Sequence, residues 1–321
     1  MENELQYAET PREYTLQLLQ RITYNFSEER EVGRGGFGIV YKGVLDDGKE
    51  IAVKKLHQML FLGNKKFQTE LDNLKMAQHE NIVRLLGYCN HTGKILVEHD
   101  GKLVYAEVEE RALCLEYLEA GSLDKHLSDE SCELDWHTCY KIIKGVCEGL
   151  NYLHNGCKHP IYHLDLKPAN IFLDKFMRPK IGDFGLSKLF DSNDTYVTHS
   201  HPQGTLGYMP NEYIDNRQIS PKFDVFSLGV IIIEIMAGKT GYSESAAISR
   251  RKFVNLVHKN WTKRLQARMS SRTSQRIRTC IEIALRCVDT DREKRPTATK
   301  IVDELNKMDT ANYSSTSGTN L

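Results

Sequence analysis

The stretch Y-H-L-D-L-K-P-A-N-I-F-L-D, residues 162–174, holds an acid, a base and an amide within six positions: Asp165, Lys167 and Asn170. Pro168 stands among them, and a proline inside a helix removes a backbone hydrogen bond and clashes with the preceding turn. The three polar side chains are therefore predicted to project from a rigid loop. The simpler interpretation is a turn that caps a helix, in which Asp165 and Asn170 are solvated loop residues.

The composition of the chain describes an ordinary globular protein. Its 321 residues are 40% hydrophobic and 27% charged, and at roughly 100–200 residues per domain the length corresponds to about two domains. The 43 basic and 43 acidic residues cancel, so bulk charge offers no attraction to nucleic acid or to a membrane. No signal peptide is expected from the start M-E-N-E-L-Q. No transmembrane span is expected either, because the longest apolar run, Leu228–Met236, is interrupted by Glu234.

The eight cysteines contain no C-x-x-C pair, and most of them have apolar neighbours, as in C-I-E-I-A-L. Buried free thiols in a reducing compartment are the expected state. This favours a cytoplasmic location for the chain.

A glycine-rich stretch, E-V-G-R-G-G-F-G-I-V-Y-K-G-V, covers Glu31–Val44 and contains G-x-G-x-x-G at Gly33, Gly35 and Gly38. In a dinucleotide-binding unit this pattern would open a helix. Here it is followed by Ile39-Val40-Tyr41 and by a D-D-G turn, so we predict a strand–glycine loop–strand hairpin. Such a loop covers nucleotide phosphates with backbone N–H groups, and glycine lets the backbone approach them.

The next predicted strand, Ile51-Ala52-Val53-Lys54, places a lysine among apolar residues, where its charge needs a partner. The candidate partner is Glu70, sixteen positions later in K-K-F-Q-T-E-L-D-N-L. The apolar residues around it share one face of a predicted helix, from which Glu70 would point inward while Asp72 faces water. The alternative is that both charged residues lie on the surface.

Further strands at 81–87, at 94–97 and 103–106 around an H-D-G-K turn, and at 112–118 are implied by a family resemblance, and the periodicity of the chain supports them only loosely. The pattern then becomes helical over Trp136–Asn155. After the opening stretch come I-G-D-F-G-L at 181–186, a hydroxyl-rich segment at 187–203 and G-T-L-G-Y-M-P-N-E-Y at 204–213. Asp224 begins a strongly apolar predicted helix.

These motifs, in this order over residues 26–308, resemble the protein kinases, and within them the plant receptor-like and receptor-like cytoplasmic serine/threonine kinases of the Pelle-related group. The resemblance implies an α+β, bilobal fold: a small antiparallel β lobe at 26–118 with one key helix, and a larger helical lobe at 119–308. ATP would bind in the cleft between them. Residues 1–25 would be an N-terminal extension with a helix packed onto the first domain, and residues 309–321 a disordered tail.

The resemblance also implies a role for each polar residue of the motifs. Asp165 would accept the proton of the substrate hydroxyl, and Lys167, typical of the serine/threonine-specific kinases, would steady the γ-phosphate. Lys54, paired with Glu70, would bind the α- and β-phosphates. Asn170 and Asp183 would hold Mg²⁺, with Mn²⁺ as an alternative. The residues implied to surround the nucleotide are Gly33, Arg34, Gly35, Gly36, Phe37, Gly38, Val40, Ala52, Lys54, Leu115, Glu116, Leu118 and Phe172.

Other contacts follow from the same resemblance. Glu212 is expected to pair with Arg295, and the Thr205 hydroxyl to contact Asp165 and Lys167. The carboxylate of Asp224 is expected to bind the backbone of the catalytic loop.

Three positions depart from the pattern of the family. Leu164 stands where an arginine usually pairs with a phosphorylated activation segment, and leucine cannot form that pair. Asn211 replaces the proline of A-P-E, and Phe172 replaces a leucine beneath the adenine, which narrows the expected pocket.

The function implied is transfer of the ATP γ-phosphoryl group to protein Ser or Thr, in plant immune or receptor signalling. The expected partners are a protein substrate and a receptor or co-receptor that brings the chain to the inner face of the plasma membrane; no nucleic-acid partner is expected. The main alternative is a pseudokinase scaffold that binds nucleotide and partners without turnover. A small-molecule phosphotransferase is disfavoured by the substrate-docking G-T-L-G-Y segment.

Overall fold

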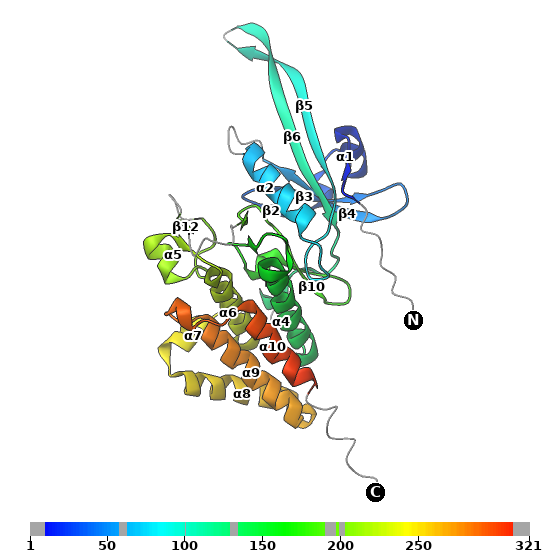
Figure 1. Cartoon of the computed structure of the whole chain (residues 1–321). Helices are drawn as coiled ribbons and strands as arrows, with labels where there is room; N and C mark the ends of the chain where they lie inside the picture. The colour runs from blue at the N-terminus through cyan, green and yellow to red at the C-terminus, as the bar shows by residue number, and fades with distance from the viewer. Residues whose placement is uncertain are drawn as a thin grey trace. The chain divides into compact units, whose positions relative to one another are not determined.

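The computed structural model describes residues 10–57, 63–99, 101–128, 134–189, 197–198 and 203–310. The chain divides into two compact units, residues 1–78 with 83–119 and residues 79–82 with 120–321. The first unit is mainly a β sheet and the second mainly helices (Figure 1). The predicted α+β architecture is confirmed.

The first unit is built on a six-stranded sheet with the order β1-β5-β6-β4-β3-β2. Its strands are β1 (Arg12–Glu13), β2 (Glu31–Gly35), β3 (Gly38–Val44), β4 (Glu50–Leu56), β5 (Leu85–His99) and β6 (Lys102–Glu116). Two helices accompany the sheet, α1 (Leu16–Ile22) and α2 (Gly63–Met76), and a 3-10 turn, η1 (Glu28–Arg30), precedes β2. All neighbouring strands are antiparallel except the short β1, which pairs with β5 in parallel.

Helix α1 belongs to the predicted N-terminal extension and covers one face of this sheet. The hydroxyl of Thr15 begins the helix by accepting a hydrogen bond from the Leu18 amide at 3.2 Å. Leu19 and Ile22 are buried in one apolar cluster with sheet residues. The sheet residues of that cluster are Ile51, Val53, Cys89, Ala112 and Cys114. The expected packing of this helix onto the first unit is therefore confirmed.

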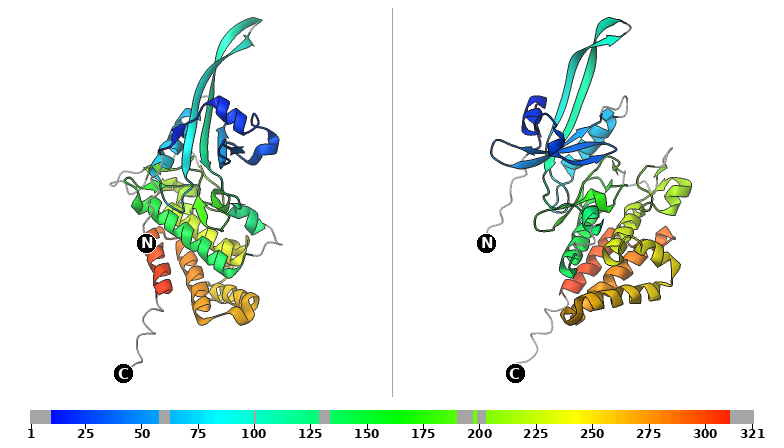
Figure 2. Two further views of the ribbon diagram at one scale, coloured as in Figure 1. Left: turned by 90° about the vertical axis from the view of Figure 1, so that its right-hand side faces the viewer. Right: turned by 180° about the vertical axis from the view of Figure 1, so that it is seen from behind.

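The β5–β6 hairpin is longer than the sequence predicted. Each strand has 15 residues, and they pair continuously out to His99 and Lys102. Strand β4 pairs with β6 only over Ala112–Glu116, so the outer hairpin extends beyond the rest of the sheet (Figures 1 and 2). The separate short strands predicted at 94–97 and 103–106 are parts of one ribbon.

The second unit contains the helices α3 (Leu123–Ser128), α4 (Trp136–Asn151), α5 (Asn211–Asn216), α6 (Lys222–Ala237), α7 (Gly241–Ala247), α8 (Arg250–Leu265), α9 (Ser271–Cys287) and α10 (Ala298–Thr310). A π-helical turn, η2 (Tyr152–Gly156), follows α4, and the 3-10 turns are η3 (Pro168–Asn170), η4 (Gln266–Arg268) and η5 (Arg292–Lys294). The strands are short: β7 (Gly121–Ser122), β8 (Ile161–Tyr162), β9 (Ile171–Leu173), β10 (Pro179–Ile181), β11 (Lys188–Leu189), β12 (Val197–Thr198) and β13 (Gln218–Ile219).

Helix α6 forms the core of this second unit. Its sequence is apolar on all sides, and thirteen of its sixteen residues are buried, including Asp224. Gly229 lets α9 approach closely, because a Cβ at this position would lie 2.6 Å from the Cβ of Cys287. A central helix of this kind is a rigid base from which Asp224 can organise a neighbouring loop.

The predicted tail begins too early. Helix α10 continues to Thr310, and the Asp309 carboxylate binds the Lys144 ammonium at 2.6 Å and the Tyr140 hydroxyl at 3.0 Å. It also pairs with Arg276. These polar contacts hold the last helical turn in place. The prediction looked for apolar periodicity, and polar contacts of this kind do not produce it. Residues 311–321 lie outside the described residues.

The cysteine prediction is confirmed for the seven cysteines that the structure describes. All seven are free, and all are buried except the half-buried Cys157. Burial raises the pKa of Cys89 to about 11, so this thiol stays protonated near neutral pH. Cys132 lies outside the described residues. In the described part of the chain, no helix is long and apolar enough to cross a membrane.

Candidate active site

Asp224 fixes the backbone of the loop that carries the predicted catalytic residues. Its two carboxylate oxygens accept hydrogen bonds from the amides of His163 and Leu164, each at 2.8 Å. His154, on the π-helical turn, lies 2.9 Å from the same carboxylate. Burial alone would raise the pKa of Asp224, but the hydrogen bond and charge of His154 and the Leu164 amide lower it. The expected role of Asp224 is borne out by these contacts.

Leu164 occupies an unusual position for a leucine. Its φ of 62° lies in the left-handed region that non-glycine residues rarely adopt. Asp224 holds this backbone in place by accepting hydrogen bonds from the amides of Leu164 and of His163 before it. The Leu164 side chain is only 3% exposed. It packs in a buried apolar cluster with Tyr162, Met209, Tyr213, Ile219 and Phe223. The leucine therefore fills apolar space in which a guanidinium would lose its hydration.

Asp165, Lys167 and Thr205 form a closed triangle of hydrogen bonds. The Lys167 ammonium donates to Asp165 Oδ2 at 2.8 Å and to the Thr205 hydroxyl at 2.7 Å. The Thr205 hydroxyl donates to Asp165 Oδ1 at 2.7 Å. The expected contact of Thr205 with both residues is confirmed. A carboxylate in this arrangement is oriented by its donors and can accept a proton from another hydroxyl.

Asn170 lies beside the same carboxylate. Its amide nitrogen donates to the Asp165 carbonyl at 2.8 Å and to Asp165 Oδ2 at 3.2 Å. Its backbone carbonyl accepts from the Gly182 amide at 2.9 Å, which brings the next residue, Asp183, close to the loop. Because the amide nitrogen of Asn170 faces Asp165, the amide oxygen is the atom that can face a cation.

The donor set fits a magnesium ion that keeps other ligands. One amide oxygen from Asn170 and one carboxylate from Asp183 leave most positions to water and phosphate, as magnesium prefers. Among the described residues, no group of three or more His, Cys, Asp or Glu side chains could hold a metal ion.

The Lys54–Glu70 pair in the first unit is buried. The Lys54 ammonium lies 2.7 Å and 2.9 Å from the two Glu70 carboxylate oxygens, and the side chains are 9% and 3% exposed. Phe67, Leu71 and Leu74 are buried around Glu70, while Asp72 is exposed. The predicted pairing is confirmed, and the surface alternative is excluded for both residues.

Four predicted nucleotide residues share one face of the first unit's sheet. Val40 is directly opposite Lys54, and Ala52 is directly opposite Leu115. Residues opposite each other, and residues two apart on a strand, point to the same face. This is the face away from α1, which packs on Ile51 and Val53. The register thus gathers a lysine and three apolar side chains on one surface.

The predicted glycine loop has open space around two of its glycines. Gly35 is paired with Gly38, and Gly33 with Val40, in the β2–β3 hairpin. A Cβ at Gly35 or Gly36 would meet nothing within 4 Å, whereas at Gly38 it would lie 2.2 Å from the Lys55 carbonyl. Gly38 is therefore required by strand packing. Gly35 and Gly36 leave the bare backbone that close approach to phosphate needs.

The remaining predicted nucleotide residues lie in varied surroundings. Arg34 forms an ion pair with Glu31, donating at 2.9 Å. The Phe37 ring lies 5.8 Å from the Lys54 ammonium. The Glu116 carboxylate accepts from the Arg84 amide at 2.7 Å, and Leu118 is half-buried beyond the end of β6. Phe172 belongs to the second unit, where it is half-buried on β9 opposite Ser122 and Lys180.

The segment after the hydroxyl-rich stretch is bonded to α6 through residues that the sequence analysis did not assign. The Tyr208 hydroxyl donates to the Glu234 carboxylate at 3.0 Å, and Ser227 donates to the Tyr208 carbonyl at 2.6 Å. Burial raises the pKa of both Tyr208 and Glu234. The sequence did contain a sign of this contact: Glu234 interrupts an apolar helix, and a buried acid needs a hydrogen-bond partner.

The predicted pair of Glu212 and Arg295 is confirmed. The guanidinium binds both carboxylate oxygens, at 2.6 Å and 2.9 Å, from a fully buried position. Asn211, the residue that replaces the usual proline, is exposed at the start of α5. The substitution therefore leaves the neighbouring ion pair intact.

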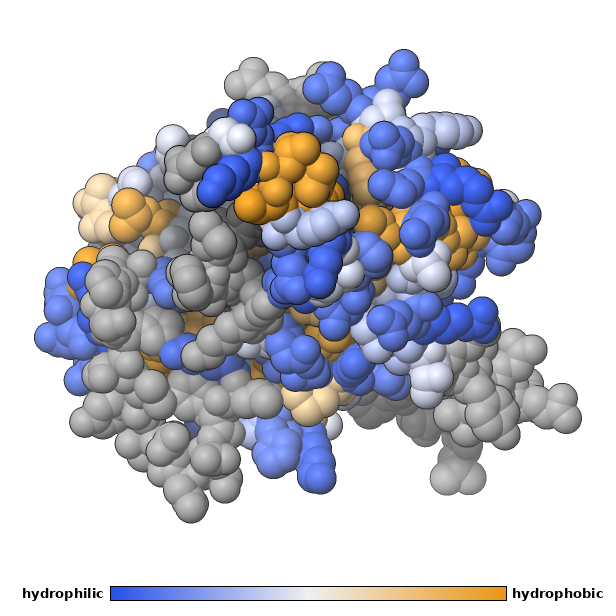
Figure 3. Space-filling view, turned by 90° about the horizontal axis from the view of Figure 1, so that it is seen from above, coloured by the Kyte–Doolittle hydropathy of each residue, from blue (hydrophilic) through white to orange (hydrophobic). Residues whose placement is uncertain are grey.

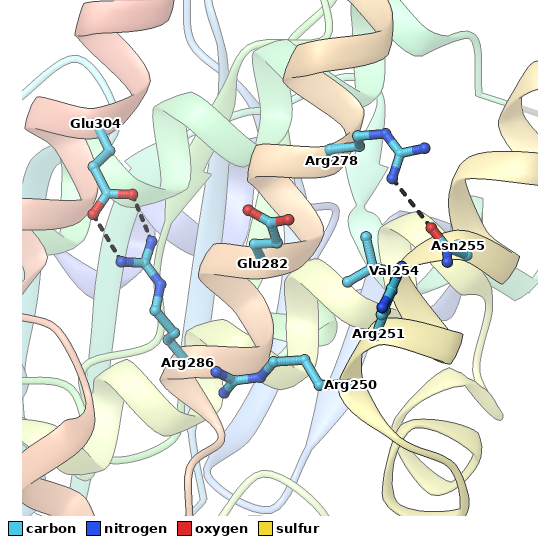
Figure 4. Close-up of a pocket in the computed structure, with 8 residues that line it drawn as sticks. All are labelled: Arg250, Arg251, Val254, Asn255, Arg278, Glu282, Arg286 and Glu304. Carbon is cyan, nitrogen blue, oxygen red and sulfur yellow. Dashed lines mark hydrogen bonds and ion pairs between the residues drawn. The ribbon is translucent and has the colours of Figure 1, made fainter.

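A groove elsewhere in the second unit contains none of the predicted catalytic residues. It is lined by Arg250, Arg251, Val254, Asn255, Arg278, Glu282, Arg286 and Glu304 from α8, α9 and α10 (Figure 4). Arg286 binds Glu304 through two hydrogen bonds, and Arg278 donates to Asn255 at 3.3 Å. The first contact joins α9 to α10, and the second joins α9 to α8.

Comparisons with known proteins agree with this geometry. The family model described as "Protein kinase domain" matches residues 26–305. Cysteine-rich receptor-like protein kinase 41 of Arabidopsis thaliana is 39% identical over 299 residues, which are 90% of this chain and 43% of that protein. Receptor-like serine/threonine-protein kinase SD1-7, from the same plant, is 37% identical over 97% of this chain and 36% of its own length.

One relative is covered more fully. Cysteine-rich receptor-like protein kinase 44 of Arabidopsis thaliana is 39% identical over 90% of this chain, and the match covers 75% of that protein. The chain spans about two-fifths of the length of the first curated relatives that it matches.

Proposed function

Because the chain belongs to the protein kinase domain family, with receptor-like serine/threonine kinases among its relatives, we propose that it transfers the ATP γ-phosphoryl group to Ser or Thr hydroxyls of proteins. The observation that supports this most directly is the oriented carboxylate of Asp165, with Lys167 and Thr205 as donors. A base that is held by donors on both oxygens keeps its direction, as proton removal from a substrate hydroxyl requires.

The steps assigned to this chain's residues are positioning and charge compensation. The Asp165 carboxylate accepts the proton of the substrate hydroxyl as the hydroxyl oxygen forms its bond to the γ-phosphorus and the bond from that phosphorus to the bridging oxygen breaks, so that ADP leaves. The Lys167 ammonium, 2.8 Å from that carboxylate, lies where it can also compensate charge on the transferred group. A magnesium ion supplies neutralisation of the β- and γ-phosphate oxygens, and Asn170 and Asp183 would hold it.

The first unit would bind the rest of the nucleotide. Lys54, kept in place by Glu70, would bind the α- and β-phosphates, while Gly35 and Gly36 offer open backbone to them. Val40, Ala52 and Leu115 share the face of Lys54 and would contact the adenine.

The pseudokinase alternative receives less support. A scaffold without turnover does not need its charged site residues, yet Lys54, Glu70, Asp165, Asn170 and Asp183 are all present. The bonds that orient Lys54 and Asp165 are also formed. Active kinases require this combination.

The setting in the cell is part of the same proposal. The relatives carry the name receptor-like, so we infer that the chain acts on the cytoplasmic side of a membrane, with a receptor or co-receptor as its partner. A role in plant immune or receptor signalling would follow from that partner.

The experiment that tests the activity is autophosphorylation of the purified chain with radiolabelled ATP, with and without magnesium. We expect magnesium-dependent incorporation into Ser and Thr, absent from Asp165→Asn. A wild-type chain that binds ATP and transfers nothing, to itself or to a general protein substrate, would favour the pseudokinase.

A further inference from the structure

His57, the residue that follows β4, contacts the turn of the glycine-rich hairpin at two places. The turn consists of Gly36 and Phe37. Gly35 ends β2 before it, and Gly38 begins β3 after it. The His57 amide donates a hydrogen bond to the Phe37 carbonyl at 3.1 Å. The ring nitrogen Nε2 of His57 lies 3.2 Å from the Gly35 carbonyl oxygen. A single residue therefore holds the backbone at both ends of this turn.

The second contact requires a donor at one particular atom of the side chain. A carbonyl oxygen accepts hydrogen bonds and cannot donate them, so Nε2 of His57 carries the proton in its bond to Gly35. The backbone bond from the His57 amide would form with any residue at this position except proline. The bond from Nε2 depends on the side chain, and a substitution can remove it alone.

The bond to Gly35 also sets the direction of the next amide along the chain. In a trans peptide unit the C=O and the following N–H point in opposite directions within one plane. Because the Gly35 carbonyl points toward the His57 ring, the Gly36 N–H points away from that ring. A Cβ at Gly36 would meet nothing within 4 Å, so the space beside this residue is open to a ligand.

The same turn lies beside the lysine that is expected to bind phosphate. The Lys54 ammonium is 5.8 Å from the centre of the Phe37 ring. Lys54 belongs to β4, and His57 follows that strand directly. One strand therefore supplies both the lysine and the residue that orients the turn.

We propose that His57 is a positioning residue for nucleotide binding, an inference that rests on the proposed kinase function. By holding the Gly35 carbonyl, the His57 ring aims the Gly36 amide at the phosphate groups of ATP. Backbone N–H groups in turns form anion-binding sites of this kind. His57 acts through the backbone of the turn and not through a contact of its own with the nucleotide.

The exposure of His57 limits how strong this effect can be. His57 is exposed to solvent. Viewed from above, the surface of the molecule is largely polar, and apolar side chains form separate orange groups on it (Figure 3). A hydrogen bond that water can replace contributes modestly to stability, so its loss should weaken ATP binding by about fivefold.

Calorimetric titration of the purified chain with a non-hydrolysable ATP analogue, and competition of the analogue with adenosine, tests the proposal. His57→Phe keeps a ring but has no donor, and it should bind the analogue about fivefold more weakly than the wild type does. Adenosine has no phosphate, so its binding should be unchanged. A general loosening of the first unit would instead weaken both ligands alike.

Two amide variants test the position of the donor. The Nε2 of glutamine reaches about as far from the backbone as the Nε2 of histidine, whereas the Nδ2 of asparagine lies nearer to it. His57→Gln should therefore keep most of the affinity for the analogue, and His57→Asn should lose as much as His57→Phe. His91→Phe, at a half-buried histidine of β5, is the matched control and should bind both ligands as the wild type does.

The outcomes separate this proposal from the proposed function. Equal binding of the analogue by the wild type and His57→Phe overturns the role of His57 and leaves the kinase function standing. Equal weakening of both ligands, or a His57→Gln variant that binds as weakly as His57→Asn, also overturns it. The pair of amide variants decides the question by itself if His57→Phe does not fold. A wild-type chain that binds no ATP analogue overturns both proposals.

Discussion

The buried Lys54–Glu70 pair and the Asp165–Lys167–Thr205 triangle are both built from a lysine and a carboxylate, but they differ in surroundings. In the first, both side chains are almost completely buried. In the second, Lys167 is half-buried, and the Thr205 hydroxyl is hydrogen-bonded to both Lys167 and Asp165. The buried Lys54–Glu70 pair holds the Lys54 ammonium in one fixed position. A more open triangle can exchange one hydroxyl for another, which a proton-accepting site must do.

The largest effect is expected where the open triangle loses its base. Asp165→Asn should reduce turnover by about 10³-fold or more, because an amide cannot accept the substrate proton. The protein should remain folded and still bind Mg-ATP, since the oxygen of the new amide can preserve the contact with Lys167. Turnover is measured with radiolabelled ATP and binding by calorimetry. Asp303→Asn, an exposed acid on α10, is the control, and wild-type turnover in Asp165→Asn would refute the assignment.

Asp183→Asn should have a similar effect for a different reason. It removes the charged ligand of the metal, so neutralisation of the β- and γ-phosphates is lost. Unlike Asp165→Asn, this variant should also show weaker dependence of ATP binding on magnesium, which calorimetry at several magnesium concentrations measures. If ATP binding kept its wild-type dependence on magnesium, Asp183 would not be a ligand.

Substituting either member of the buried Lys54–Glu70 pair should lower turnover by about the same factor. Lys54→Met and Glu70→Ala should each lower turnover by about 10²-fold, and the double variant little more, because one change already misplaces the phosphates. Lys55→Met is the matched control: it is adjacent in sequence but pairs with Glu110 at 3.1 Å. Rates from a complete double-mutant cycle give the coupling, and additive losses would mean that the contact does not act in catalysis.

Most of the two clusters was predictable from residue types that have few other uses, whereas the place of Thr205 in the triangle was implied only by the family resemblance. A lysine in an apolar strand requires a counter-ion, and an acid, a base and an amide around Pro168 require a loop. The strands of the outer β5–β6 hairpin were harder to predict, because Glu107, Glu109 and Glu110 interrupt the apolar alternation. Their conformation comes from pairing with β5, which is a tertiary effect. Glu234 and Tyr208 were missed because their contact joins two distant segments.

A smaller loss of turnover is expected when Thr205, the hydroxyl member of the triangle, is changed. Thr205→Val removes the hydroxyl that joins Asp165 to Lys167, with the same side-chain shape. We expect kcat to fall by about 10-fold, equivalent to ~1.4 kcal/mol, with the KM for ATP unchanged. Thr205→Ser should restore most of the activity, because it keeps the hydroxyl. A change confined to KM would place Thr205 in nucleotide binding instead.

The smallest effect concerns Leu164, beside the triangle. Kinases with arginine at this position are switched by phosphates on the activation segment, because the guanidinium pairs with the new charge. Here the side chain is buried among apolar residues, and Arg178 already binds Asp174 at 2.7 Å. Changing Thr195, Thr198 and Ser200 together to Ala should therefore alter activity by less than about threefold, under ~0.7 kcal/mol. Of these three, Thr195 and Ser200 lie outside the described residues.

The measurement is turnover of the triple-Ala protein beside the wild type, each before and after phosphatase treatment. Thr205 stays unchanged, since its hydroxyl belongs to the triangle. With leucine in place of the arginine that would receive a phosphate, added charge on the segment gains little ordering energy. Control of activity would then act elsewhere, through α2, which carries Glu70, or through a partner. A hundredfold drop in the triple variant, together with recovery on phosphorylation of the wild type, would show that another cation replaces the missing arginine.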